Sequence, residues 1–307
     1  MLRYTLIRII QAVITVWCVS VIVFGLARLT GNPLDIIMPP EATEEDYARV
    51  SVELGLDRPL PVQYGVFIKS ALQGKFGESL RFRKPAMEVV LERLPNTIQL
   101  GALAFVFAVL IALPIGVYSA KHRGSPLDNF GRGFAILGQS VPHFWTGIML
   151  ILVFAVWLHL LPASGKGGIE YFILPAITQA YVITAGIMRI TRSAMLDVLD
   201  TEYIKLARGK GLRESIVTWK HAARNAMIPV LTFSAMTFIR VLVGSLVVET
   251  VFAWPGVGRL VVESVMYRDY TVIQTVVLLF SIMFIIGNLI TDILYVYADP
   301  KIKYSGK

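Results

Sequence analysis

The chain has 307 residues, of which 55% are hydrophobic and 16% are charged, and its formal net charge is +8. A soluble domain of this size needs more charge on its surface, and here the apolar residues form long uncharged runs that a lipid bilayer explains and a globular core does not. The composition therefore excludes an ordinary soluble protein and predicts a membrane protein.

Six runs are candidates for membrane spans, because a span needs about 20 apolar residues. They cover residues 9–27, 97–120, 134–161, 171–188, 226–252 and 272–297. A backbone in lipid must satisfy its own hydrogen bonds, so we expect helices. The first run has a basic start, but it is longer than the apolar part of a signal peptide and no small-x-small cleavage site follows, so we interpret it as uncleaved. The prediction is an all-α membrane protein with six transmembrane helices.

Basic residues gather in every second loop, and short loops rich in lysine and arginine stay in the cytosol. These loops and the two ends of the chain contain Arg3, Arg8, Lys121, Arg123, Arg132, Lys205, Arg208, Lys210, Arg213, Lys220, Arg224, Lys301, Lys303 and Lys307. We therefore expect both termini to be cytosolic. Because the charge is spread over loops rather than gathered in one domain, we expect no nucleic-acid binding.

The loop between the first two spans is the largest segment expected on the outer face. Thr43 followed by Asp46 predicts a helix start, and Gly55 predicts its end. A second short helix is predicted over residues 62–72 and is closed by Gly74. We expect a small, ordered helical cap.

The loop between the fourth and fifth spans predicts a basic helix–glycine–helix segment. Asp200 or Thr201 is a candidate N-cap, and Gly211 is a candidate left-handed stop. A second helix is predicted to start near Glu214 and to end at Asn225. Helices this short are marginal in water, so packing on the membrane domain or on a partner must hold them. An ordinary basic loop explains the charge but neither the caps nor the apolar positions at helical spacing.

This segment resembles the cytosolic EAA loop of ABC-importer permeases, in the form found in the dipeptide/oligopeptide (peptide/opine/nickel) family. The matching residues are Tyr203, Ala207, Lys210, Gly211, Leu212, Lys220, His221, Ala222, Arg224, Asn225, Ala226 and Pro229. Stretches 54–60, 93–97, 140–145 and 252–260 also resemble that family, and the closest likeness is to the first, or B-type, of its two paired permeases. The chain departs from the family pattern at residues 30–33 and at Gly209.

The resemblance implies a multi-pass permease of the bacterial cytoplasmic (inner) membrane that forms half of a pathway for peptides or related small solutes by alternating access. It implies four partners besides membrane lipid: a second homologous permease, two ATPase subunits, and a periplasmic or lipid-anchored substrate-binding protein. It implies a first transmembrane helix over 1–28, a periplasmic or extracellular cap over 29–96, and a core over 97–307 with its coupling loop at 190–225. The implied ATPase-coupling residues are Tyr203, Ala207, Gly211, Leu212 and His221.

The chain contains no motif for ATP hydrolysis of its own. The stretches 165–167 and 209–211 both have Gly-Lys-Gly, but they lack the upstream glycine and the magnesium-binding Ser or Thr of a P-loop. We therefore expect no enzyme activity and no cofactor in this chain, with ATP and magnesium held by partner ATPases. The four histidines are scattered, so no metal site or catalytic residue is predicted.

Several alternatives stay open at this point. Arg240 is a charge in mid-span, and with Gln139 it is a candidate for the translocation pathway; hydrogen bonds to Gln139, Gln179 or backbone carbonyls, or a partner on the second permease, are the structural alternative. Such a charge also suits an ion-coupled secondary carrier. The solute could instead be glutathione, a nickel complex, an opine or an oligosaccharide. Finally, Glu44, Glu45 and Trp254 are candidates for docking the binding protein, or for merely bracing the helices.

Overall fold

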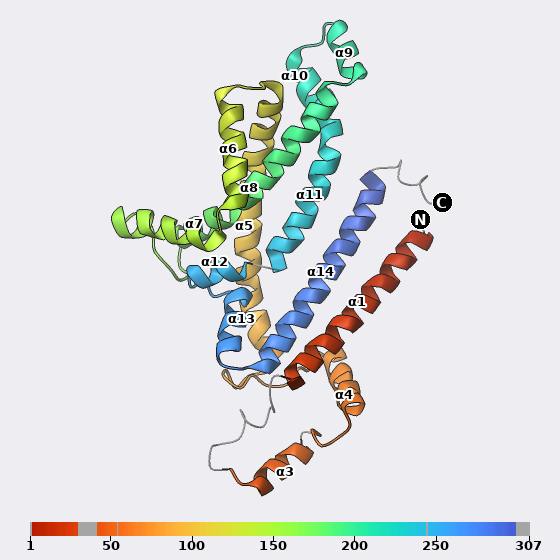
Figure 1. The fold of residues 1–307 in the computed structure, drawn as a ribbon, viewed down its shortest axis with the longest axis vertical. Helices are drawn as coiled ribbons and strands as arrows, with labels where there is room; N and C mark the ends of the chain where they lie inside the picture. Colours follow the sequence, from red (N-terminus) through yellow and green to blue (C-terminus); the bar gives the residue numbers. More distant parts are fainter. Residues whose placement is uncertain (1, 30–41, 54, 244, 299–307) are drawn as a thin grey trace. The chain divides into compact units, whose positions relative to one another are not determined.

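The computed structural model describes residues 2–29, 42–53, 55–243 and 245–298, and in these ranges the regular structure is helical (Figure 1). The stretch 30–33 and the lysines Lys301, Lys303 and Lys307 lie outside the described residues. The helices are α1 (Leu2–Leu29), α3 (Glu44–Glu53), α4 (Leu60–Leu72), α5 (Ala86–Lys121), α6 (Pro126–Ser140), α7 (His143–Leu150), the π-helix η1 (Ile151–Trp157), α8 (Glu170–Leu199), α9 (Glu202–Gly209), α10 (Glu214–Ile216), the π-helix η2 (Val217–Ala222), α11 (Ala223–Val243), α12 (Leu246–Val251), α13 (Val257–Met266) and α14 (Tyr270–Ala298).

Five helices of the described residues are long and apolar enough to cross a membrane. They cover Leu6–Leu29, Ala86–Lys121, Glu170–Leu199, Glu214–Leu242 and Tyr270–Thr291. A sixth span results if α6 and the α7–η1 segment are counted as one bent crossing. The all-α membrane fold predicted from the apolar runs is thereby confirmed.

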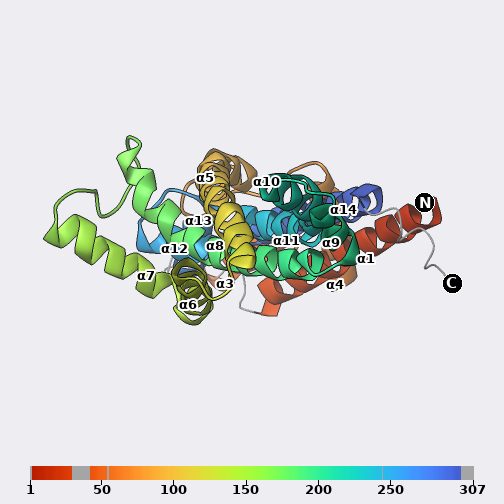
Figure 2. The ribbon, with the colours of Figure 1, turned by 90° about the horizontal axis from the view of Figure 1, so that it is seen from above.

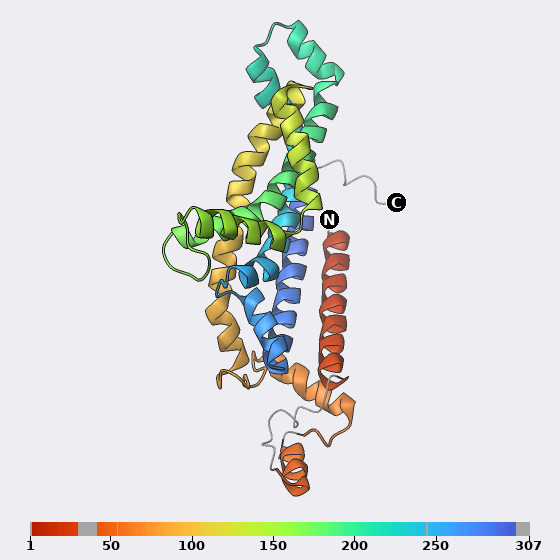
Figure 3. The ribbon, with the colours of Figure 1, turned by 60° about the vertical axis from the view of Figure 1, so that its left-hand side comes forward.

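The third predicted run, 134–161, is not a continuous helix. The two halves of this run meet at an angle of 109° between Ser140 and His143, and Figures 2 and 3 show α7 leaving the end of α6 sideways. The cause is Pro142, which disfavours helical geometry in the residue before it, and Val141 has the extended values φ −90° and ψ 125°. The Tyr181 hydroxyl donates to the Val141 carbonyl at 2.8 Å, which satisfies an acceptor that the break releases.

The contacts of the chain divide it into two compact units, which we describe separately. The first contains residues 1–95 and 256–289. Its core is built from the start of α5 with α13 and α14, where Val90, Leu260 and Val272 are fully buried. A hydrogen bond of 2.5 Å from the Ser79 hydroxyl to Asp269 ties the segment before α5 to the start of α14.

The predicted cap helices are confirmed in the first unit. The Thr43 hydroxyl accepts from the Asp46 amide and donates to its carboxylate, which starts α3 as a capping box. These hydrogen bonds hold the pKa of Asp46 below its ordinary value. Gly55 and Gly74 follow α3 and α4 with φ of 65° and 72°, the left-handed geometry that glycine adopts without steric cost.

The second unit contains residues 96–255 and 290–307, and α8 lies at its centre. Helices α6, α7, α11 and α12 all pack against α8. Small residues let the helices approach closely, as in other membrane bundles. The clearest case is Gly138 on α6: a Cβ atom there would lie 2.4 Å from the Cβ of Ala185 on α8.

The fifth predicted run, 226–252, differs from the structure at both ends. The helix starts at Glu214 rather than near Ala226, because α10, η2 and α11 form one continuous rod. The helix that the sequence predicted from Glu214 to Asn225 is therefore not separate but forms the first part of this continuous helix. At its other end α11 stops at Val243, and the short helix α12 begins at Leu246.

Candidate functional site

A central cavity of about 420 Å³ lies in the second unit, among the end of α6, α7, α8, α11 and α12. Its polar lining comes from Gln139, His143, Gln179, Arg189, Thr237, Arg240 and Ser245. The break at Pro142 and the end of α11 at Val243 both lie next to this lining in the sequence. Irregular backbone at membrane depth is tolerated where it lines a cavity, so these breaks and the cavity belong together.

Two buried polar atoms of the central cavity have no hydrogen-bond partner among the described residues. They are the amide oxygen Oε1 of Gln179, a residue that is 4% exposed, and Nδ1 of His143. An unpaired buried acceptor costs free energy that a bound donor restores. The cavity is therefore prepared for a ligand, or for water, that donates hydrogen bonds.

Arg240 lines the central cavity from α11, and in the described part of the chain its side chain forms no ion pair or hydrogen bond. Gln139 and Gln179, the two glutamines that the sequence analysis considered as neighbours of Arg240, line the same cavity. Gln139, however, is held by another residue: its Oε1 accepts from Nη1 of Arg189 at 2.9 Å. The hydrogen bond between Arg240 and Gln139 or Gln179, which was one structural alternative, is therefore not formed among the described residues.

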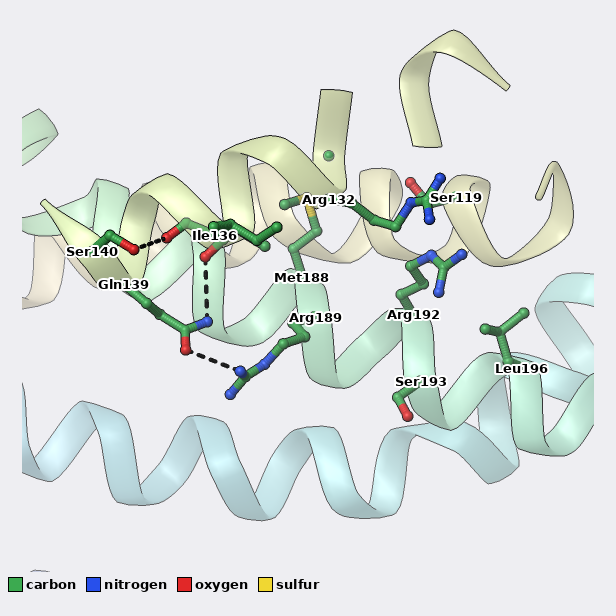
Figure 4. A pocket seen from close by; sticks show the side chains of 12 residues that line it. Ser119, Arg132, Ile136, Gln139, Ser140, Met188, Arg189, Arg192, Ser193 and Leu196 are labelled. Atoms are coloured by element: carbon green, nitrogen blue, oxygen red, sulfur yellow. Dashed lines mark hydrogen bonds between the residues drawn. The ribbon is translucent and has the colours of Figure 1, made fainter. Parts of the chain in front are cut away.

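A second cavity, of about 520 Å³, lies between α6 and α8 and is called the arginine cavity here. Arg132, Arg189 and Arg192 line it together with Ser119, Gln139 and Ser193 (Figure 4). Gln139 and Arg189 line both cavities, so the hydrogen bond between them stands where the two cavities meet.

A buried carboxylate supports the arginine cavity without lining it. Asp128 is fully buried and accepts from Nε and Nη2 of Arg192 at 2.7 and 3.1 Å. It also accepts from the Gly124 amide at 2.9 Å, and Arg132 lies 3.8 Å away. This bidentate, multiply bonded geometry is what a buried charge requires, and it fixes the N-terminal end of α6 to α8.

Glu249 is a second buried carboxylate, and it contributes to neither cavity. It accepts from the Thr97 hydroxyl at 2.8 Å and from the Ser245 hydroxyl, which joins α12 to α5. Its environment is explained by these structural contacts, since it ties together the part of the bundle where α11 has ended.

The predicted coupling segment forms the end of the second unit, where Figure 1 shows α9 and α10 beyond the ends of α8 and α11. Thr201 precedes α9, and Gly211 follows it with φ of 73°, as predicted. Ile204 and Ala207 are buried in the core of the unit together with Val217 and Ala222. The packing that a short helix needs is therefore supplied by the chain itself.

The five candidate coupling residues lie on two sides of this segment. Ala207 faces the core, whereas Tyr203, Gly211 and Leu212 are exposed and His221 is half-buried. The Asn225 side chain donates to the Tyr203 hydroxyl at 2.8 Å and to the His221 carbonyl at 3.0 Å. Leu206 and Trp219, which the sequence-based candidates did not include, add apolar surface at 61% and 57% exposure.

The three docking candidates have different environments. Glu44 and Glu45 are exposed in the first turn of α3. Trp254 is fully buried among Leu100, Leu174 and Phe252, and its indole nitrogen donates to the Asn96 carbonyl at 3.1 Å. Its side chain is therefore enclosed by the helices of the second unit in this conformation.

Comparisons with known proteins agree with this architecture. A family model described as "Binding-protein-dependent transport system inner membrane component" matches residues 112–304, and the model of the N-terminal part of such components matches residues 1–101. The chain is 42% identical over 305 residues to the glutathione transport system permease protein GsiC of Salmonella typhimurium strain LT2, covering 99% of this chain and 100% of that protein. It is 41% identical over the same length to GsiC of Escherichia coli strain K12, with the same coverage.

Solved structures show the same fold. The inward-facing MetNI methionine ABC transporter matches with a TM-score of 0.57 at 19% identity, covering 69% of this chain and 97% of that one. An amino acid ABC transporter, solved with histidines, matches with a TM-score of 0.56 at 17% identity, covering 68% and 93%. At these identities the likeness concerns the fold alone.

Proposed function

Because the chain belongs to the family of binding-protein-dependent transport system inner membrane components, we propose that its central cavity is its part of the solute pathway and receives a carboxylate of the solute. The chain is the permease subunit of an ABC importer and a multi-pass protein of the bacterial inner membrane. It therefore works with a partner permease, ATPases and a substrate-binding protein. Membership of this family also replaces the alternative function of an ion-coupled secondary carrier.

The proposal rests on a guanidinium and a buried amide oxygen in one cavity, neither of which has a hydrogen-bond partner in the part of the chain that the structure describes. Arg240 offers the charge that attracts a carboxylate, and Oε1 of Gln179 accepts a hydrogen bond from an amide or ammonium group. A cavity of about 420 Å³ lies within the range of small-ligand sites. Peptides have both groups, and so does glutathione, the solute in the name of the GsiC relatives.

The solute class that this geometry favours is short peptides with a free carboxylate, including glutathione. Because the chain supplies a single unengaged arginine to this cavity from its described residues, the site binds weakly, as a pathway site must if release is to be fast. Opines also carry carboxylates and fit the same chemistry, whereas neutral oligosaccharides do not use the arginine.

Arg240→Ala tests the proposal in proteoliposomes that contain the complete transporter. Uptake of glutathione should fall about tenfold or more, because that is the effect expected from the loss of one hydrogen bond to a charged group. Uptake of the glutathione analogue whose carboxylates are amidated should change little. The matched control is Arg240→Lys, which keeps the charge and should retain most of the preference for the carboxylate. Equal losses for both solutes, or normal uptake of both, would contradict the pathway assignment.

For the coupling segment, we propose that the exposed side of α9 and its neighbours bind an ATPase subunit. The support is the apolar surface at Tyr203, Leu206, Leu212 and Trp219 on a segment whose other side is anchored in the core. Two ATPase subunits would serve the two permeases, one for each such segment, and would hold the ATP and magnesium.

For the substrate-binding protein, we propose that α3 contributes to its docking surface through Glu44 and Glu45. Both carboxylates are exposed at the start of a capped helix, so they are presented in a fixed geometry. Reversing both charges should weaken stimulation of the ATPase by the loaded binding protein at low salt and less so at high salt. Stimulation that is unchanged at low salt would remove these residues from the interface.

A further inference from the structure

The arginine cavity has features of a binding site that the packing of α6 on α8 does not explain. Among the residues that the structure describes, its lining includes three arginines and no acid. Asp128 compensates one of the three charges through its bidentate contact with Arg192. Arg189 has the neutral partner Gln139, and Arg132 bonds to Asn129 while it lies 3.8 Å from the same Asp128 carboxylate. Two positive charges are therefore in excess around a cavity of about 520 Å³.

A buried hydroxyl gives an independent indication of a ligand. Ser119 lines the arginine cavity from α5, it is 1% exposed, and its Oγ has no hydrogen-bond partner among the described residues. Figure 4 shows Arg132 and Arg192 extending toward the same end of the cavity, near Ser119, while Arg189 joins Gln139 at the other end. Hydroxyl and guanidinium groups that converge in this way bind an oxyanion.

The position of the arginine cavity along α8 connects it with transport. On α8 its lining extends from Met188 to Leu196, whereas that of the central cavity ends at Arg189, and Arg192 lies about 10 Å along the helix axis before the end of α8 at Leu199. The coupling segment begins three residues after Leu199. The arginine cavity thus lies between the central cavity and the coupling end of the bundle, and it shares Gln139 and Arg189 with the central cavity.

We propose that the arginine cavity is a second, exit-side site for the carboxylate of the solute, which passes from Arg240 to Arg132 and Arg192 by way of Arg189. This inference rests on the proposed function of the central cavity. A phosphate group of a lipid headgroup has the same oxyanion chemistry. The continuity of the two cavities through Gln139 and Arg189 favours the solute, because a lipid would have no reason to share lining residues with the pathway.

The test is binding of radiolabelled glutathione to the complete transporter in phosphatidylcholine nanodiscs, without nucleotide and without binding protein. It is done in an Arg240→Ala background, so that the central cavity contributes little. Arg132→Gln should raise the Kd about tenfold, and Ser119→Ala should raise it several-fold. Arg123→Gln is the matched control: it removes an exposed arginine that pairs with Asp200 outside the cavity, and it should leave the Kd unchanged.

Arg132→Gln is expected to fold, because Arg132 is about half exposed and Asp128 keeps its contact with Arg192. If Arg132→Gln and Ser119→Ala both bind glutathione as the background does, the exit site is overturned. It is also overturned if phosphatidylglycerol in the nanodiscs abolishes glutathione binding and co-purifies with the background protein but not with Arg132→Gln, since the cavity then holds a headgroup. Neither result depends on the uptake assay with Arg240→Ala, so the two proposals can fail separately.

Discussion

The two faces of α9 predict opposite behaviour for two neighbouring apolar residues. Ile204 is fully buried in the core of the second unit, whereas Leu206 is 61% exposed. Replacing Ile204 by alanine should detach α9 from the bundle. Replacing Leu206 by alanine should leave α9 in place and remove surface that the ATPase is proposed to bind.

The magnitudes follow from the burial of each side chain. Truncating a buried isoleucine to alanine costs about 2–5 kcal/mol, which lowers the ratio of docked to detached α9 by roughly 30- to 4,000-fold. An eight-residue helix has almost no stability of its own to offset that loss. For Leu206, burying the exposed part of the side chain in an interface is worth about 1–2 kcal/mol, so its loss weakens ATPase binding about 5- to 30-fold.

Amide hydrogen exchange on the permease pair without ATPases separates the two effects. We expect Ile204→Ala to lose protection throughout α9 and Leu206→Ala to keep it, while both variants lose ATPase activity that depends on the binding protein. Protection of α9 that survives in Ile204→Ala would refute the anchoring argument. Loss of protection in Leu206→Ala would show that Leu206 also anchors α9 to the bundle, which would contradict its assignment to the exposed face.

Three further outcomes are expected. Gly211→Val should strain the left-handed turn after α9 by about 1 kcal/mol or more and uncouple transport from ATP hydrolysis; coupled transport at the normal rate would exclude the turn from force transmission. Gly138→Val should lower the thermal stability of the purified permease, because the Cβ of the new valine would overlap that of Ala185. The control Gly133→Val places its side chain in open space and should not lower it, so equal melting temperatures of the two variants would contradict this packing. The lowered pKa of Asp46 means that its contribution to α3 is complete above about pH 4 and is lost as the pH falls through that pKa; a carboxyl NMR titration at the ordinary value would count against the cap.

The helices and turns that the sequence predicted well are those with local signals. The capping pair of Thr43 and Asp46 and the left-handed turns at Gly74 and Gly211 each depend on a few adjacent residues. Where prediction failed, hydropathy had been used as a helix boundary. The continuous helix that starts at Glu214 runs from a basic segment into an apolar one without interruption. A helix ends where its backbone hydrogen bonds stop, which need not be where its side chains change polarity.

The same error hid most of the charged residues of the cavities. Arg240 is identifiable from the sequence because it interrupts an apolar run, whereas Arg189 follows directly after the predicted end of the fourth span at Met188, and Arg192 falls within the predicted coupling loop 190–225. In the structure α8 continues to Leu199, so Arg189 and Arg192 belong to a membrane helix and line the arginine cavity. The contact of Arg192 with Asp128 joins positions 64 residues apart, and no local pattern predicts it.

The breaks in the helices explain why the cavities occur where they do. In a bilayer, each carbonyl or amide released at a break needs a new partner, so a break is stable only beside polar groups or water. Tyr181 supplies that partner at the bend after α6, and Ser245 begins α12 while its hydroxyl donates to Glu249. Among the described residues, Arg240 and the Gln179 oxygen have no hydrogen-bond partner in the cavity beside these breaks. In the function proposed above, these two groups are the ones that a passing solute contacts, and a solute that binds them need not break the hydrogen bonds that hold the bundle together.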